Sequence, residues 1–579
     1  MKILVILLLL FSGCSEQSRN SDGLLTDAQS NKVKEFIVNN RNNKLEPDIK
    51  KEFGSNLRGL KLTGVNLSGL DLSGIDLSFC QMSRINFSAT TFKDVILEKS
   101  IIQDSDFSNT IINNINARYA DFQASIFEKA TIKNVDFFNS NFEEADFTGT
   151  TLDQVNFTKS NLIATIFEQS NINNSNFQQS NLGQGEFKKA QITESVFYGT
   201  DLSNVQANSI KIQNCYFESA DLTNANFTLA TLTDSNFSHS LFDEIKLIEA
   251  QINNCAFLFT SFQHAHFIKT LITQCNLQNA DLSNVNFEQA KITDSNLQNT
   301  NLNGATVSAV NIKKVNATSS NLHTAGITNT TIEDSNLQNI MLNNTTINNL
   351  TIINSDLTGG TFINSSVDKS QFKQSKLNKI FSKATNLTKV KFTSSNITQS
   401  AFTDSNLQEV TFDSSQIVNS QVNNVRGTKI NLINSTATKT LILNTEGFEQ
   451  FQSDTNILSL KDLQNVSNLS NMNFQELSLA NLTFKPQINF ANTIFKQTDL
   501  SKSKMQSCIF DYADLTGANL TDADLSGSRF TSSNFKSTIL YRTKFDYADL
   551  TNLDFSNSLI DTISLVNTKL DGTVGIVKP

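Results

Sequence analysis

A phenylalanine stands at every twentieth position in one stretch of the chain, namely Phe137, Phe157, Phe177, Phe197, Phe217, Phe237 and Phe257. A finer period runs through the same region, because an apolar residue also occupies nearly every fifth position from Leu57 to Ile442. Neither period matches the helical repeat of about 3.6 residues or the strand repeat of about 2. The sequence therefore predicts a repeat protein, in which one small unit is copied along the chain.

Each five-residue unit has a large central residue and a small residue two places before it, as in Ala145 before Phe147 and Ala220 before Leu222. If both side chains point inward, the backbone has to change direction once per unit. Residues of one type recur at intervals of twenty, and a second such series runs from Ile172 to Ile352. Like residues stack on like when four units complete one turn, so the period predicts a four-sided coil. Its stability comes from stacking of neighbouring coils.

Two units illustrate the pattern especially well: Ala220-Asp221-Leu222-Thr223-Asn224 and Ala145-Asp146-Phe147-Thr148-Gly149. They resemble the pentapeptide-repeat family, and the resemblance extends over about four-fifths of the chain. It implies an all-β fold, the right-handed quadrilateral parallel β-helix of that family. In our prediction a short N-terminal helix, opened by a capping box at Thr26-Asp27-Ala28-Gln29, covers the first coil; the alternative is a surface helix within the tether.

The composition limits the classes of function. Only 38% of the residues are hydrophobic and 17% are charged, so uncharged polar residues fill the remainder. The 44 phenylalanines, many placed in register, argue against a disordered polar chain. A formal net charge of −9 over 579 residues is modest, and it argues against a nucleic-acid-binding surface, which would be basic.

The first residues have the features of a secretory signal. Lys2 precedes an apolar run that is too short to span a bilayer, and Ser12-Gly13-Cys14 follows. The segment resembles a bacterial lipobox, although Phe11 replaces the usual leucine. The resemblance implies lipidation of Cys14 and, with Ser15 next to it, sorting to the outer membrane. The alternative is an ordinary signal peptide in which the cysteine has no role.

The repeat pattern sets the predicted domain boundaries. Residues 1–13 form the signal peptide, 14–52 the lipidated tether and capping helix, 53–445 a first solenoid, 446–471 an insertion or hinge, and 472–579 a second solenoid. The five-residue period fails in the insertion, which is therefore a candidate loop for contact with a partner; the alternative is binding along a flat face of the solenoid. Its candidate interaction residues are Phe448, Phe451, Leu458 and Leu460. Ser459 is expected to open a short helix there.

The sequence offers no catalytic motif above the background of a chain rich in serine and aspartate. His264 and His266 fall on outward positions without other ligands at suitable spacing, so we predict no metal site and no cofactor. Cys255 and Cys275 occupy small inward positions one coil apart. A disulfide between them is within reach, but parallel side chains favour two buried thiols.

These observations favour a non-enzymatic repeat scaffold, anchored in the cell envelope, that binds protein or acts as a rigid spacer. Its expected partners are protein and, through the lipid, a membrane, while nucleic acid is not expected. The segment 572–579 has no capping helix, so the C-terminal end is also a candidate homodimer contact. Family resemblance gives one alternative, a DNA-mimicking protein that protects gyrase or topoisomerase. A secreted effector built on the same scaffold is another alternative. Mimicry needs dense negative charge, and asparagine often stands where aspartate would be required.

Overall fold

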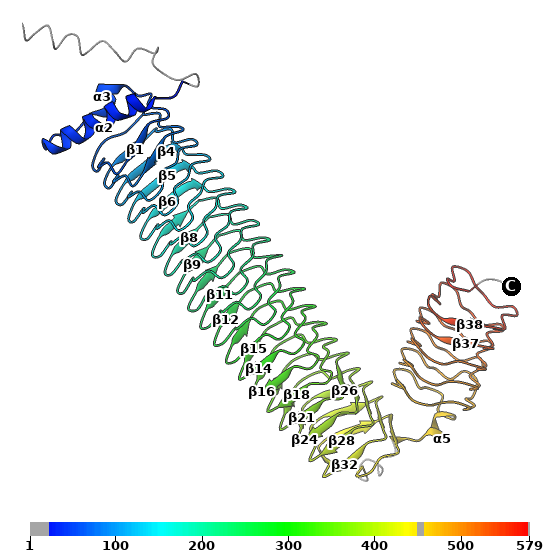
Figure 1. Ribbon diagram of the computed structural model, residues 1–579. Helices are drawn as coiled ribbons and strands as arrows, with labels where there is room; N and C mark the ends of the chain where they lie inside the picture. Colours follow the sequence, from blue (N-terminus) through cyan, green and yellow to red (C-terminus); the bar gives the residue numbers. More distant parts are fainter. Residues whose placement is uncertain (1–22, 449–456, 577–579) are drawn as a thin grey trace, which may run out of the picture. The chain divides into compact units, whose positions relative to one another are not determined.

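The computed structural model describes residues 23–448 and 457–576, which form two compact units, 1–301 and 302–579. Both units are parallel β-solenoids in which a residue pairs with the residue twenty positions further along, as in Ile132 with Leu152 and Ile327 with Ile347. Figure 1 shows these strands stacked coil upon coil within each unit. The predicted fold class, a quadrilateral β-helix with a short N-terminal helix, is confirmed.

Within residues 23–301 the first unit contains two helices and thirteen short strands. The helices are α2 (Asp27–Asn42) and α3 (Ile49–Phe53). Strands β3 to β13 form one face of the solenoid, and β1 and β2 pair on another. The strands are β1 (Lys61–Thr63), β2 (Gln81–Ser83), β3 (Thr91–Lys93), β4 (Ile111–Asn116), β5 (Thr131–Asp136), β6 (Thr151–Asn156), β7 (Asn171–Asn173), β8 (Gln191–Thr193), β9 (Lys211–Gln213), β10 (Thr231–Thr233), β11 (Gln251–Asn253), β12 (Leu271–Thr273) and β13 (Lys291–Thr293).

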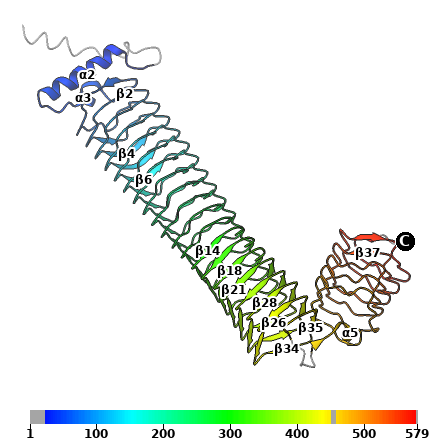
Figure 2. The same cartoon turned by 60° about the horizontal axis from the view of Figure 1, so that its bottom comes forward.

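The second unit shows all four faces as separate parallel sheets, followed by helix α5 (Leu460–Leu463) and further coils (Figure 2). One face carries β15 (Asn311–Lys313), β17 (Thr331–Glu333), β19 (Thr351–Ile353), β22 (Gln371–Lys373), β25 (Lys391–Thr393), β29 (Thr411–Asp413) and β33 (Asn431–Ile433). The next carries β14 (Thr306–Ser308), β16 (Gly326–Thr328), β18 (Thr346–Asn348), β21 (Ser366–Asp368), β24 (Asn386–Thr388), β28 (Asn406–Gln408) and β32 (Arg426–Thr428). The third carries β20 (Thr361–Ile363), β23 (Phe381–Lys383), β27 (Ala401–Thr403), β31 (Gln421–Asn423), β35 (Thr440–Leu443) and β36 (Ile457–Leu458). The fourth carries β26 (Asn396–Thr398), β30 (Gln416–Val418) and β34 (Thr436–Thr438), and β37 (Ile539–Tyr541) pairs with β38 (Leu559–Asp561) further on.

The corners of the coil depend on one backbone conformation. The residue two places after each centre has a positive φ in nearly every unit, for example 58° at Phe79 and 59° at Glu144. A turn hydrogen bond closes many of the corners, as when the Ala145 amide donates to the Phe142 carbonyl at 2.9 Å. Left-handed residues are costly unless they are glycine, asparagine or aspartate. In the first coils this position is glycine, and later it is often asparagine or aspartate.

The interior consists of stacked side chains, and most of its small polar residues are hydrogen-bonded. The phenylalanine ladder from Phe137 to Phe257 is buried, and successive rings stack with centroids 4.5 to 5.2 Å apart. The small inward serines donate to backbone carbonyls, as when Ser160 Oγ donates to the Phe137 carbonyl at 2.6 Å. Ordered stacking of this kind adds to the transfer free energy of about 1.5–3 kcal/mol for each large side chain.

Helix α2 covers the first coil of the first unit. The predicted capping box is present, since the Gln29 amide donates to Thr26 Oγ1 and the Thr26 amide donates to Gln29 Oε1. Val33 and Ile37 are buried against the coil, and the Lys61 amide of β1 donates to Ser30 Oγ at 3.1 Å. The helix thus supplies both apolar cover and hydrogen bonds for backbone groups that a bare end would leave unpaired.

Candidate functional site

The residues predicted for an interaction loop lie at the end of a core. Phe448 is buried, and its ring fills the space beside Gly427, where a Cβ atom would lie 3.0 Å from Phe448 Cε2. Leu458 pairs with Leu441 through β36, and both Leu458 and Leu460 pack partly buried against the core that follows. Phe451 lies outside the described residues, as does the predicted lipidation site, Cys14.

The cysteines and histidines of the described residues form no reactive cluster. Among residues 23–448 and 457–576, no group of three or more potential ligands could hold a metal ion. Five cysteines are described, all of them free and buried. Burial raises the pKa of the Cys275 thiol to about 11 and that of Cys80 to about 12. Thiols with such pKa values are poor nucleophiles at neutral pH.

The outward aromatic side chains of the first unit are confined to one edge. Within residues 54–301, every Phe or Tyr that is not an inward core residue stands one before, one after or two after a centre of the series 57, 77, 97 and so on to 257. We call these residues the aromatic edge: Phe79, Tyr119, Phe138, Tyr198, Tyr216 and Phe259. Tyr216 is 59% exposed and Phe259 is 54% exposed. A random distribution would place such residues on all four edges.

Cations alternate with rings at the N-terminal part of the aromatic edge. The Arg58 guanidinium lies over the Phe79 ring, 5.0 Å from the ring centroid. Lys99 Nζ lies 5.3 Å from the same centroid and 6.0 Å from the centroid of Tyr119. The Arg118 guanidinium lies 4.5 Å from the Phe138 centroid. Each such contact contributes about 0.5–1 kcal/mol at an exposed site. They hold the rings in defined orientations, which lowers the entropy cost of binding through them.

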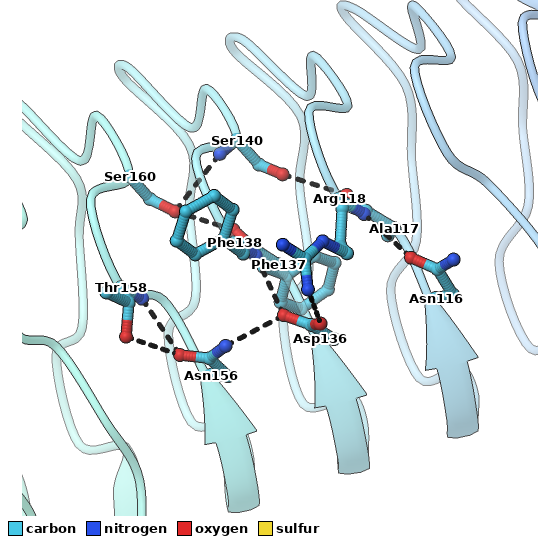
Figure 3. A network of polar contacts seen from close by, with 10 residues as sticks. All are labelled: Asn116, Ala117, Arg118, Asp136, Phe137, Phe138, Ser140, Asn156, Thr158 and Ser160. Carbon is cyan, nitrogen blue, oxygen red and sulfur yellow. Dashed lines mark hydrogen bonds and ion pairs between the residues drawn. The ribbon is translucent and has the colours of Figure 1, made fainter.

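Figure 3 shows the polar contacts that support this part of the edge. Arg118 Nη1 lies 3.2 Å from Asp136 Oδ2. The pKa of the guanidinium is raised, mainly by its hydrogen bond with Tyr119 and in addition by the charge of Asp136. Asn156 Nδ2 donates to Asp136 Oδ1 at 2.8 Å, while Asn156 Oδ1 accepts from the Thr158 amide at 3.1 Å. The asparagines of this face therefore brace the corners and link adjacent coils.

An open groove of about 570 Å³ runs beside the edge, lined in part by Asn116, Asp136 and Asn156. Formal charges along the edge between residues 56 and 259 balance. The cations are Arg58, Lys99, Arg118 and Lys159, and the carboxylates are Asp76, Glu98, Asp136 and Glu218. The surface is thus aromatic and rich in amides, without net charge of either sign.

Comparison with known proteins agrees with the observed repeat. A family model described as pentapeptide repeats (8 copies) matches residues 54–78, 71–109, 211–247, 271–308, 487–522 and 523–559, and a pentapeptide repeat region model matches 140–213. The chain is a pentapeptide-repeat protein. No curated protein sequence matches it.

Solved structures similar to this pentapeptide-repeat protein include HetL from Nostoc sp. strain PCC 7120, involved in regulation of heterocyst differentiation, with 18% identity over 42% of this chain and 90% of HetL, and a TM-score of 0.22. QnrB1, a plasmid-mediated fluoroquinolone resistance protein, shows 14% identity over 41% of this chain and 91% of its own, with a TM-score of 0.17. Rfr23 from Cyanothece 51142 shows 18% identity over 20% and 95% of the two chains, with a TM-score of 0.16. TM-scores this low carry no functional argument.

Sequence reasoning followed the inward positions of this pentapeptide-repeat protein and missed the aromatic edge. The signal was present, because sorting the outward residues by their position within the twenty-residue turn brings Tyr119, Tyr198 and Tyr216 to the same edge. The sequence also placed four interaction residues in the insertion. Of these, the structure places Phe448 in a core and leaves Leu458 and Leu460 half-buried.

Proposed function

We propose that this chain is an exported, non-enzymatic scaffold that binds a partner protein along the aromatic edge. The observation that carries the proposal is the confinement of all outward Phe and Tyr residues of the first solenoid unit to that edge. Exposed aromatic rings do not stabilise the core, so their placement calls for another role. Large, rigid rings are the side chains that contribute most at protein interfaces.

The chemistry of the edge fits a protein better than a nucleic acid. Tyr, Phe and Arg are enriched at the centres of protein interfaces, and the edge carries all three. Binding to nucleic acid relies on a surplus of Lys and Arg facing phosphates. Here Arg58, Arg118 and Lys99 lie next to the carboxylates Asp76, Asp136 and Glu98. A rigid solenoid keeps the rings at fixed spacing, so little ordering cost remains for binding.

Photo-crosslinking tests this surface. A photoreactive amino acid at Tyr216, on the edge, should give a discrete protein adduct in the native host, while the same residue at Lys246, exposed on the opposite edge, should not. The adduct should disappear when Tyr198 and Phe259 are replaced by alanine. Equal adducts from both positions, or adducts that persist in the alanine variant, would contradict the proposal.

Export and anchoring are a second part of the proposal. They are supported by the apolar run before Cys14 and by the polar stretch after it, which resembles a tether. Within the described residues no helix is both long and apolar enough to cross a membrane. A lipid on Cys14 would supply the attachment. Metabolic lipid labelling with membrane fractionation checks this, because Cys14→Ala should abolish both the label and the membrane association, whereas label retained in that variant would disprove lipidation at Cys14.

A further inference from the structure

A cavity of about 290 Å³ lies within the unit of residues 302–579. One wall comes from the coils that carry β20 and β23 and includes Lys379 and Phe381. The other wall comes from the coils after the insertion and includes Ile494, Lys496 and Tyr512. Its volume is close to the lower limit for sites that hold a small molecule, about 300 Å³.

Specific contacts join the two walls. Gln399 Nε2 donates to the Asn492 carbonyl at 3.0 Å, and Gln421 Nε2 donates to the Gln475 carbonyl at 2.7 Å. Lys383 forms an ion pair with Glu476. The Gln399–Asn492 and Lys383–Glu476 contacts each join residues 93 positions apart in the sequence. Phe381 stands at an outward strand position, yet it is only 5% exposed because the later coils cover it.

The charged groups of the cavity leave it positive. The Lys379 ammonium has no hydrogen bond or ion pair within residues 23–448 and 457–576. Lys496 Nζ lies 3.3 Å from Asp514 Oδ2, the only carboxylate among the lining residues. Asp514 Oδ1 already accepts from the Thr516 amide at 3.1 Å and from Thr516 Oγ1 at 2.5 Å. The cavity therefore offers hydrogen-bond donors and a net positive charge, and its one carboxylate, Asp514, is already paired with Lys496 and hydrogen-bonded to Thr516.

The cavity has both apolar and polar lining residues. Phe381, Ile494 and Tyr512 supply apolar surface, and Tyr512 is 62% exposed. Gly359 and Asn339 also line the cavity; Gly359 has φ +79°, and a Cβ atom there would come within 2.3 Å of Asn339 Oδ1. An alanine at this position would therefore displace the Asn339 amide, a hydrogen-bonding group of the lining.

We propose that this cavity binds a small organic carboxylate carrying one polar six-membered ring. The carboxylate would be held by Lys379 and Lys496, the ring faces would contact Phe381 and Tyr512, and Asn339 would bind a ring hydroxyl. Ammonium groups favour an anion, and charge-assisted hydrogen bonds are the stronger ones. The apolar walls favour a ring over a bare inorganic anion.

Such a ligand would also stabilise the contact between the two walls. Buried polar atoms of the covered face, including Thr403 Oγ1, Gln421 Oε1 and Asn423 Oδ1, have no hydrogen-bond partner in the described structure. Unpaired buried groups weaken the contact that covers them. A molecule that touches both walls binds only when they are together, so binding and docking of the later coils are thermodynamically linked.

Calorimetric titration of the full-length chain with sodium glucuronate tests the site, with glucose as the neutral control and inorganic phosphate as the bare anion. We expect glucuronate to bind at least tenfold more tightly than either control. Lys379→Gln should weaken glucuronate binding by roughly tenfold or more, the effect expected for one charge-assisted hydrogen bond. Bound glucuronate should also slow amide exchange in peptides covering 379–383 and 492–496.

Lys389→Gln is the matched control, because Lys389 is exposed at an equivalent left-handed corner and does not line the cavity. It should leave binding unchanged, and circular dichroism checks that both variants fold. The proposal is overturned if glucuronate gives no binding heat, if glucose or phosphate binds as tightly, or if Lys379→Gln and Lys389→Gln behave alike. The site lies in a different unit from the aromatic edge, so failure of either proposal leaves the other standing.

Discussion

Replacing Ser382 by valine should stabilise the unit of residues 302–579. Ser382 occupies a central inward position, where it pairs with Phe362 in the coil before and Phe402 in the coil after. It is only 2% exposed, and its hydroxyl has no hydrogen-bond partner among the described residues. A cavity of about 20 Å³ lies beside it, and the other lining side chains are apolar.

The magnitude follows from two terms. The cavity has room for about one water, but a stable buried water needs two to four polar partners and Ser382 offers one. Burial of the hydroxyl without a hydrogen bond therefore costs about 1–3 kcal/mol of desolvation free energy, and valine removes this cost. Filling part of the cavity adds about 0.8 kcal/mol per methylene-sized group, less any strain from tight packing. We expect a net gain of about 1–3 kcal/mol.

Hydrogen exchange measured by mass spectrometry suits this test, because solenoids are stabilised locally through neighbouring coils. Exchange in peptides covering 361–403 should slow by roughly tenfold per 1.4 kcal/mol gained. Ser400 provides the control. Its hydroxyl donates to the Leu377 carbonyl at 2.7 Å and accepts from the Ile380 amide at 3.1 Å, so Ser400→Val should speed exchange. Faster exchange in Ser382→Val, or equal effects at both serines, would refute the reasoning.

Three further predictions concern corners, thiols and acid. Leu229→Gly should raise the free energy of unfolding by about 1 kcal/mol in urea titrations, because Leu229 has φ 62° and glycine adopts this conformation without strain. Gly199→Ala should lower it, because Gly199 has φ 61° and a Cβ atom there would make only an ordinary contact, 3.9 Å from Gln179 Cγ. Shifts of the same sign in the two variants would contradict this. Cys275, whose pKa burial raises to about 11, should react with a disulfide reagent at pH 8 only after unfolding, and rapid native labelling would be inconsistent with burial. The Arg542 side chain donates to Asp522 and lowers the pKa of that carboxyl, so its stabilising effect is complete above the unfolded pKa of 3.8 and is lost as pH falls through the folded value. NMR titration should show a higher Asp522 pKa in Arg542→Ala than in the unaltered chain, and an unchanged pKa would contradict the assignment.

The fold could be predicted from the sequence because the same pattern of inward residues is repeated in unit after unit. The twenty-residue recurrence of Phe137, Phe157 and their successors fixes both the number of sides and the register, and no single unit has to be interpreted alone. The capping box at Thr26 could also be predicted from the sequence, since it depends on two residues only three positions apart. Local and periodic signals of this kind survive in the sequence without knowledge of tertiary contacts.

The corner conformation was harder to see. Gly59, Gly64, Gly69 and Gly74 mark the left-handed position in the first coils, but lysine, glutamine and even leucine occupy it later. The strain is distributed over many units and is offset by stacking, so composition at the corner does not reveal it. The packing of Phe448 beside Gly427 likewise could not be predicted from the sequence, because the two residues meet only where the last coil before the insertion ends.

The candidate site was missed for a physical reason that also gives it weight. An inward residue is constrained by its neighbours, so Phe137 or Phe177 reports on packing and says little about function. An outward position of a solenoid accepts almost any polar residue, and an aromatic ring there exposes apolar surface to water. Tyr119, Tyr198, Tyr216 and Phe259 all fall on one of four edges that share the same corner geometry, so packing of the core does not account for the choice. The proposed contact with a partner protein does account for it, and it predicts that polar substitutions along this edge leave folding intact while they remove binding.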